Sequence, residues 1–438
     1  MNNLKYGTLI LFAFSLSSCL KTEFDEYTNS SGSANFSTFI SVGDSYTQGL
    51  QDGGLHNEHN QQDNSYPAII AKQMETSFVQ PTVSGTGSGY MFLAYRNEKI
   101  VVVKPYDPDV LDNDAEALTY DPSYTNWVDK TVKYNNLGVG GLNVRNVVSR
   151  NTTEALEYHI YMGSSAPGVL SWNGVSGEPI VSYGRFLDWG TIGARREYID
   201  NVISSNATFF TNWLGVNDAM AWSKNGGDPN SGAYQLTNPA EFRLKYDTVL
   251  AVFKAMGAQG VCANIHDITE SPFFRTVTLE AVKKDIWIKE GADTTIIRKA
   301  TPDDLLLLSS SSLIAKGDGL TQANPLPHQQ VLDRDEVVIA KNYIQQINAQ
   351  IYASAAAHGY TVVDMYAFMD KLNKGMTYDG VALSVKYIEG GAYSLDGLHP
   401  NSRGNAMIAN ELMRVINATF GSTLRPVAIA NYGGIVFP

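Results

Sequence analysis

Five short runs of β-branched and aromatic residues decide what this chain can fold into. The runs are rich in Val, Ile, Phe and Tyr and do not alternate strictly between apolar and polar residues, as expected of strands covered on both faces. They lie at Phe39–Val42, Lys133–Leu137, Ala207–Leu214, Gly260–Ile265 and Thr361–Val363. Because helical patterns lie between them, the chain is predicted to form βαβ units with a mainly parallel sheet and helices on both sides.

Three helices follow from the spacing of apolar residues. The first begins at Ser65-Tyr66-Pro67, a plausible cap and first turn, and continues through Ile70, Met74 and Phe78. A second helix starts near Asp335, and a third follows "HPNSRG". Their apolar faces are Ala340, Ile344, Ile347 and Ile351 in the second helix, and Ile408, Leu412, Val415 and Ile416 in the third.

Three stretches, near residues 80–130, 152–190 and 272–332, are too long for the connections of a minimal α/β unit. Loops of that length often form lids or substrate walls, although decorative insertions without a catalytic role are the alternative. The third contains "DDLLLLSSSSLIA", which suits either a buried helix or a lid. We expect one catalytic domain, residues 36–438, with these insertions rather than two independent domains.

The first nineteen residues resemble a bacterial lipoprotein signal. An apolar run from about Leu9 to Leu16 is too short to span a bilayer and is followed by "LSSC". Residues 1–18 are therefore predicted to be a signal peptide, with Cys19 the lipidated first residue of the mature chain. A plain secretory peptide with an incidental Cys19 is the alternative. The polar residues 19–35 are predicted to tether the domain to a membrane of the bacterial cell envelope.

Charge and cysteine content exclude several classes of protein. The formal net charge of -12 argues against nucleic-acid binding, because the chain has no basic surplus to release counterions from phosphates. The two cysteines, Cys19 and Cys262, imply no disulfide framework because one ends the leader and the other lies in a predicted strand. The segment "LHNEHN" offers His56, Glu58 and His59 but no third ligand at a diagnostic spacing, so no metal site is predicted.

Four polar blocks follow predicted strands or precede a helix. Because open α/β sheets bind ligands at the carboxyl ends of their strands, we expect these blocks to meet. They are Gly43-Asp44-Ser45, "YNNLGVGGLN" with Gly138, Gly140 and Gly141, "GVND" with Asn217 and Asp218, and "SLDGLHP" with Asp396 and His399.

The four blocks contain every group that acyl transfer to water requires. Ser45 can act as the nucleophile, His399 as the base that takes its proton, and Asp396 as the group that orients the imidazole. The side-chain amide of Asn217 and the N–H groups of Ser45 and Gly141 can stabilise the oxyanion. Taken alone, a Gly-Asp-Ser after a strand is usually an ordinary turn. The other three blocks favour the catalytic interpretation.

In this order, "GDSYTQG", "NNLGVGG", "GVND" and "DGLHP" resemble the blocks of the SGNH hydrolases, also called the GDSL esterase/lipase family. The resemblance implies a three-layer α/β/α sandwich of the flavodoxin-like type and catalysis without metal or organic cofactor. It implies the catalytic roles above, with Gly141 as the second backbone donor because it lies five residues after Asn136. Gly140 is the competing choice for that donor.

Four residues near the blocks also receive expectations. Asp44 is expected to hold its loop through side-chain bonds to the main chain, and Asp218 to cap a following short helix. Tyr46 is expected to contact the substrate. His266, just after a predicted strand, either lines the pocket or is a loop histidine.

The prediction for function is a serine hydrolase that cleaves carboxylic esters through an acyl-enzyme. Its substrate is a small-molecule or polymeric ester, and acetyl esters on glycans suit a surface lipoprotein with aromatic-rich insertions. Two alternatives stay open at this point. One is a lipase or carboxylesterase for longer acyl chains, and the other is a non-catalytic surface lipoprotein that binds glycans.

Overall fold

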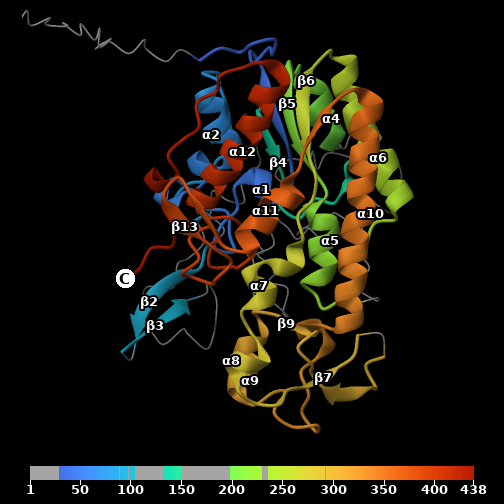
Figure 1. Ribbon diagram of the computed structural model, residues 1–438, viewed down its shortest axis with the longest axis vertical. Coiled ribbons are helices and arrows are strands. Elements are labelled where there is room, and N and C mark those ends of the chain that lie inside the picture. Colours follow the sequence, from blue (N-terminus) through green and yellow to red (C-terminus); the bar gives the residue numbers. More distant parts are fainter. Residues whose placement is uncertain are drawn as a thin grey trace, which may run out of the picture.

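Five parallel strands form the central sheet of the computed structural model, which describes residues 29–87, 89–96, 98–103, 132–148, 198–228, 235–291 and 293–438 (Figure 1). Each strand lies in or overlaps one of the five predicted runs. The strands are β1 (Phe39–Gly43), β4 (Asn136–Gly138), β5 (Phe209–Trp213), β6 (Gln259–Ala263) and β11 (Thr361–Val363). Their spatial order is β11-β6-β5-β1-β4, and all four pairings are parallel.

The strand order places the polar blocks beside one another. Counted along the chain, these strands are arranged 2-1-3-4-5, the flavodoxin-like order, whose ligand crevice lies where the order reverses. That reversal falls at β1. Gly43 at the end of β1 is level with Gly138 on one side and with Trp213 on the other. The three strands therefore end at the same edge of the sheet, and the loops that follow them begin side by side.

Helices cover both faces of the sheet, as predicted (Figure 1). α2 (Tyr66–Gln73) and α12 (Ser402–Phe420) pack together on one face. α4 (Tyr198–Ser204), α6 (Pro239–Ala255) and α10 (Arg334–His358) pack on the other. The result is the predicted three-layer α/β/α sandwich.

The helix ends follow local signals that spacing alone did not resolve. α2 ends at Gln73, so the prediction that it reaches Phe78 is wrong; Glu75 adopts a left-handed conformation with φ 54°, which stops the helix. α10 begins as predicted, because Asp333 and Glu336 form a capping box at its start. α12 begins inside "HPNSRG", where the Asn401 side chain accepts the N–H of Gly404.

The remaining elements are short. The helices are α1 (Ser45–Gln48), α5 (Val216–Ser223), α7 (Pro272–Arg275), α8 (Leu279–Val282), α9 (Ser310–Lys316) and α11 (Met365–Asn373). Among the described residues, four antiparallel pairs lie outside the central sheet. They are β2 (Phe92–Arg96) with β3 (Lys99–Val103), β7 (Trp287–Lys289) with β8 (Ile297–Lys299), β9 (Leu305–Leu306) with β10 (Val331–Leu332), and β12 (Met376–Tyr378) with β13 (Val381–Leu383).

The third predicted insertion has a small core of its own below the sheet (Figure 1). Val277, Ile286, Ile288, Leu306, Leu326 and Val331 make up this core. The prediction that "DDLLLLSSSSLIA" is one buried helix is wrong. Its first leucines form the buried strand β9, and in α9 only Ser310 is buried. The first insertion contains the β2–β3 hairpin, whereas residues 152–190 lie outside the described part of the chain.

The first described residues, 29–35, contact the folded domain. The Ser33 N–H donates to the Phe420 carbonyl at the end of α12 over 2.8 Å, and Ala34 is buried. Residues 29–35 of the predicted tether therefore pack on the fold. The signal peptide and Cys19 lie outside the described residues. Among the described helices, none is long and apolar enough to cross a membrane.

Candidate active site

Ser45 is the first residue of α1, directly beyond the carboxyl end of β1. The turn into this helix is tight. A Cβ on Gly43 would lie 1.9 Å from Thr47 Oγ1 and 2.7 Å from Thr47 Cβ, so any larger residue at this position would displace the Thr47 side chain. Asp44 caps the helix by accepting the N–H of Tyr46 over 3.1 Å. The sequence Gly-Asp-Ser thus aims the serine hydroxyl at the edge of the sheet.

Ser45, His399 and Asp396 form one continuous chain of hydrogen bonds. His399 Nε2 lies 2.8 Å from Ser45 Oγ, and His399 Nδ1 lies 2.7 Å from Asp396 Oδ2. Asp396 and His399 come from the loop before α12, 351 and more residues beyond Ser45, so the fold joins the first and fourth blocks. The arrangement is that of a nucleophile, a base and an orienting carboxylate.

Asp396 is held by more than its histidine. Its Oδ1 accepts the N–H groups of Leu398 and His399 and the hydroxyl of Ser394, over 2.8, 2.9 and 3.0 Å. Its Oδ2 also accepts the Gly53 N–H over 3.0 Å. Burial alone would raise the pKa of Asp396, but the neighbouring His399 and the hydrogen bonds from His399 and Leu398 lower the pKa to about 2. The carboxylate is therefore charged at neutral pH.

Sequence reasoning missed the turn that supports Asp396. Asp52 Oδ1 accepts the N–H of Leu395 over 2.8 Å, and the Asp52 N–H donates to Ser394 Oγ over 2.9 Å. With the Gly53 bond, three hydrogen bonds join this turn to the loop that carries Asp396. Its only signal is "QDGG", a composition typical of tight turns, and Asp52 does have a positive φ of 53°.

Two of the predicted oxyanion donors are main-chain N–H groups. In the described part of the chain, the N–H groups of Ser45 and Gly141 make no hydrogen bond. The Gly140 N–H instead donates to Gln48 Oε1 over 2.8 Å. This contact favours Gly141 over Gly140 as the second backbone donor, because an N–H engaged by a side chain is not available to a substrate.

Asn217 lies beside Gly141, but its amide is already engaged. Asn217 Nδ2 donates to the Gly141 carbonyl over 2.6 Å and to Asn143 Oδ1 over 2.9 Å. A side-chain amide has two N–H donors, so both are used. The predicted role of Asn217 as an oxyanion donor therefore requires that one of these bonds be shared with the substrate or exchanged for it.

A comparison with protein-family models settles the family. The model of the GDSL-like lipases/acylhydrolases matches residues 40–412, most of the chain and all four blocks. This chain belongs to that family. It is a hydrolase of ester bonds, as the blocks predicted.

Solved structures similar to this GDSL-like hydrolase are distant. An acetyl xylan esterase is 10% identical, with a TM-score of 0.33 over 86% of this chain and 98% of that chain. A catalytic mutant of an acetylxylan esterase from Geobacillus stearothermophilus is 10% identical, with a TM-score of 0.35 over 87% and 95%. A protein from Parabacteroides merdae described as a GDSL-like lipase is 11% identical, with a TM-score of 0.35 over 88% and 97%. A search of curated protein sequences found no match. At TM-scores this low, the similarities carry no conclusion about substrate.

Two aspartates tie the loops of this GDSL-like hydrolase together. Asp44 also accepts the Asn217 N–H over 3.0 Å, which confirms the prediction that it holds its loop through main-chain bonds. The prediction that Asp218 caps a helix is wrong, because it lies inside α5, whose N-cap is Gly215. Asp218 accepts the Val144 N–H over 2.8 Å instead, and so joins the loops after β4 and β5.

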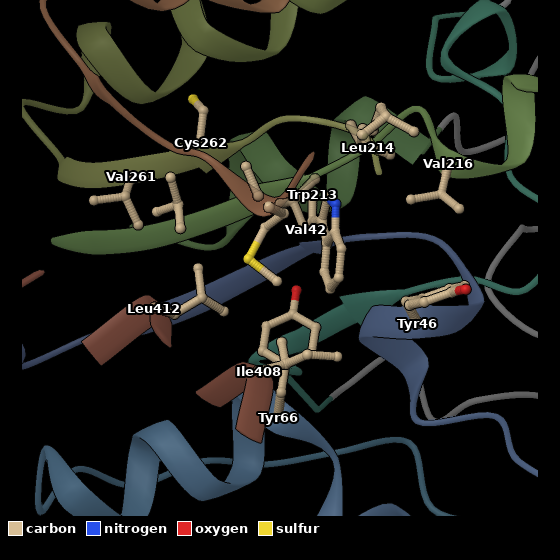
Figure 2. Close-up of a cluster of buried hydrophobic side chains, with 14 of the residues drawn as sticks. Val42, Tyr46, Tyr66, Trp213, Leu214, Val216, Val261, Cys262, Ile408 and Leu412 are labelled. Carbon is tan, nitrogen blue, oxygen red and sulfur yellow. The ribbon is translucent and has the colours of Figure 1, made fainter. Parts of the chain in front are cut away.

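Tyr46 and His266 lie beneath the catalytic residues of this hydrolase rather than in a pocket. The prediction that Tyr46 touches the substrate is wrong, because its side chain is buried beside Trp213, with ring centroids 5.3 Å apart (Figure 2). His266 is also buried and lies in the loop after β6, so the loop alternative of the prediction is confirmed. Burial lowers its pKa to about 4, which leaves the ring neutral at neutral pH.

The two histidines of "LHNEHN" lie in different environments. His56 is buried and stacks on Tyr90 with ring centroids 4.1 Å apart, whereas His59 is exposed. Among the residues that the structure describes, neither His56 ring nitrogen has a hydrogen-bond partner. No group of three His, Cys, Asp or Glu side chains suited to a metal ion occurs among the described residues.

His56 makes the stability of the enzyme depend on pH. Burial lowers its pKa to about 3, so at pH 5 the unfolded chain takes up a proton that the folded protein does not. Stability is therefore lost as the pH falls below the unfolded pKa. We expect His56→Phe, which keeps a ring against Tyr90, to remove about 2 kcal/mol of the loss in unfolding free energy between pH 8 and pH 5. Urea unfolding of both proteins at both pH values measures this, and equal losses would contradict it.

Proposed function

We propose that this hydrolase removes acetyl groups from glycans through an acyl-enzyme formed on Ser45. The observation that carries the proposal is the hydrogen-bond chain from Ser45 through His399 to Asp396. His399 Nε2, 2.8 Å from Ser45 Oγ, can accept the serine proton. His399 Nδ1 is held by the Asp396 carboxylate over 2.7 Å.

The reaction has two halves that use the same residues. Ser45 Oγ attacks the ester carbonyl carbon while His399 Nε2 takes the proton of the serine hydroxyl. The oxyanion that forms accepts hydrogen bonds from the N–H groups of Ser45 and Gly141. The protonated His399 then gives that proton to the departing alcohol, and the acyl group stays on Ser45. Water attacks the acyl-enzyme with His399 again as base. Collapse of the second intermediate releases the carboxylic acid and restores the serine.

Burial of the reacting side chains favours a short acyl group. Ser45 is 7% exposed and His399 is 8% exposed, so little of the nucleophile or its base faces solvent. An acetyl group needs room for only one methyl beyond the carbonyl, whereas a long chain needs an open apolar groove at the serine. The expectation of a glycan as the alcohol rests on the predicted surface location and the aromatic-rich insertions.

Chain-length profiling tests the acyl preference. We expect kcat/KM to be highest for p-nitrophenyl acetate and to fall roughly tenfold or more by the octanoyl ester, since each poorly accommodated methylene costs on the order of 1 kcal/mol. Acetylated xylan, assayed by acetate release, tests the glycan. A preference for octanoyl or palmitoyl esters would instead support the lipase alternative. Glycan binding without hydrolysis of any ester would support the non-catalytic one.

We further propose that the enzyme is anchored by a lipid on Cys19 to a membrane of the bacterial cell envelope. The support is the leader sequence, with its short apolar run and "LSSC". Fractionation of cells that express the wild type or Cys19→Ala tests this proposal. The wild type should sediment with membranes and the variant should be soluble, whereas equal distribution would contradict the anchor.

A further inference from the structure

We propose that Tyr46 and His266 are positioning residues that hold the catalytic His399 from beneath. The inference rests on the proposed function, since it assigns these side chains a part in the rate of acyl transfer. Neither residue belongs to the hydrogen-bond chain of Ser45, His399 and Asp396. Tyr46 directly follows the nucleophile in sequence, and His266 follows β6.

The link from Tyr46 to the base is a short hydrogen bond. The Tyr46 hydroxyl donates to the Leu398 carbonyl over 2.6 Å, and Leu398 directly precedes His399. The Tyr46 ring also packs against the His399 ring, with centroids 5.3 Å apart and planes inclined by 50°. One side chain thus contacts both the main chain that carries the base and the imidazole itself.

His266 supports Tyr46 in turn. A carbonyl oxygen only accepts, so the single hydroxyl proton of Tyr46 goes to Leu398. The hydroxyl oxygen is left as the acceptor for His266 Nε2, which lies 3.3 Å away. This assigns the proton of the neutral imidazole to Nε2. Nδ1, which is buried and has no hydrogen-bond partner in the described part of the chain, is then the unprotonated nitrogen. The order of donation is therefore His266 to Tyr46 to Leu398.

Packing leaves this arrangement little freedom. Tyr46 and His266 are both almost fully buried, and their rings lie 5.4 Å apart. Trp213 closes the group, with ring centroids 5.3 Å from Tyr46 and 6.2 Å from His266. The Tyr46 hydroxyl is buried and cannot turn to water. Removal of this hydroxyl leaves the Leu398 carbonyl without this donor, and the loop before His399 is then free to shift.

The first test is Tyr46→Phe in the full-length enzyme, assayed with p-nitrophenyl acetate. The rate is expressed per active site, counted by titration with a fluorophosphonate. We expect kcat to fall roughly tenfold with KM unchanged, because small displacements of a catalytic group are costly to the rate. A lower amount of folded enzyme would change the titre but not the rate per site.

Tyr198→Phe is the matched control. Tyr198 is as buried as Tyr46, and its hydroxyl donates to a leucine carbonyl, that of Leu137, over the same 2.6 Å. That carbonyl belongs to β4, and the hydroxyl also contacts the main chain of Gly43 in β1, so neither contact is to the loop of His399. Both variants should lose thermal stability, but kcat per site should stay within about twofold of the wild type for Tyr198→Phe. Equal rate losses in the two variants would overturn the proposal.

Substitution of His266 tests the order of the contacts. His266→Leu should lower kcat per site severalfold, and His266→Gln, whose amide nitrogen can replace Nε2, should restore most of it. In the Tyr46→Phe background, His266→Leu should have no further effect on kcat, since its partner hydroxyl is gone. Additive losses would overturn the order. A wild type that hydrolyses no ester defeats the proposed function, whereas an active wild type with an equally fast Tyr46→Phe defeats this inference alone.

Discussion

Ser45→Ala is expected to lower kcat on p-nitrophenyl acetate by roughly 10⁴-fold or more, because the acyl-enzyme cannot form without the hydroxyl. Loss of the nucleophile leaves the N–H groups of Ser45 and Gly141 in place, so a small residual rate above that of water is expected. The measurement is initial velocity at saturating ester, with enzyme concentration set by absorbance.

Ser402→Ala provides the control for this substitution. Ser402 is the first residue of α12, as Ser45 is of α1, and both are 7% exposed. The control should keep kcat within about twofold of the wild type, since the Ser402 hydroxyl accepts from Asn64 Nδ2 over 3.5 Å rather than from a catalytic side chain. If Ser45→Ala kept the wild-type rate, or if both variants lost activity equally, Ser45 would not be the nucleophile.

Asp396→Asn is expected to cost about as much, roughly 10⁴-fold in kcat, because it forces the wrong tautomer on His399. Three donors face Asp396 Oδ1, from Ser394, Leu398 and His399, so the amide oxygen of the asparagine must take that place. The amide nitrogen then takes the place of Oδ2 and donates to His399 Nδ1. The imidazole proton moves to Nε2, which faces Ser45 and can no longer accept its proton.

The same substitution can also contradict the role of Asp396 in setting the tautomer of His399. Asp396→Asn keeps the size of the side chain but puts an amide nitrogen where Oδ2 accepts the Gly53 N–H, so far-ultraviolet circular dichroism and the thermal midpoint are measured to show that the protein is intact. The kcat of an intact variant is then compared with the wild type on the acetyl ester. A loss of tenfold or less would mean that His399 acts with Ser45 as a dyad and that Asp396 serves mainly to hold the loop.

The sheet and the catalytic chain were predictable because their signals are local. Each strand is a compact apolar run, and the blocks at Ser45, Gly141, Asn217 and His399 combine residue types that acyl transfer requires. The fold then brings these blocks together, because β1, β4 and β5 end at the same edge of the sheet. The position of Gly141 was open in the sequence, and a contact to Gln48, 92 residues before Gly140, distinguishes the two glycines.

The supporting contacts were not predictable, since they join distant side chains whose residue types have ordinary local uses. Tyr46 looked like a substrate contact because it follows the nucleophile, yet the turn of α1 directs it under His399. Asp218 looked like a cap because it precedes a helical pattern, yet it accepts an N–H from Val144. Asp52 lies in a glycine-rich turn that gave no hint of the Asp396 loop.

Covalent labelling shows whether Ser45 is the nucleophile. The full-length protein is incubated with a fluorophosphonate, and intact mass spectrometry with peptide mapping locates any adduct. We expect a single adduct, on the peptide that contains Ser45. We expect no adduct in His399→Ala, which lacks the base that activates the hydroxyl. An adduct on another residue, or no adduct on an enzyme that hydrolyses p-nitrophenyl acetate, would contradict this role of Ser45.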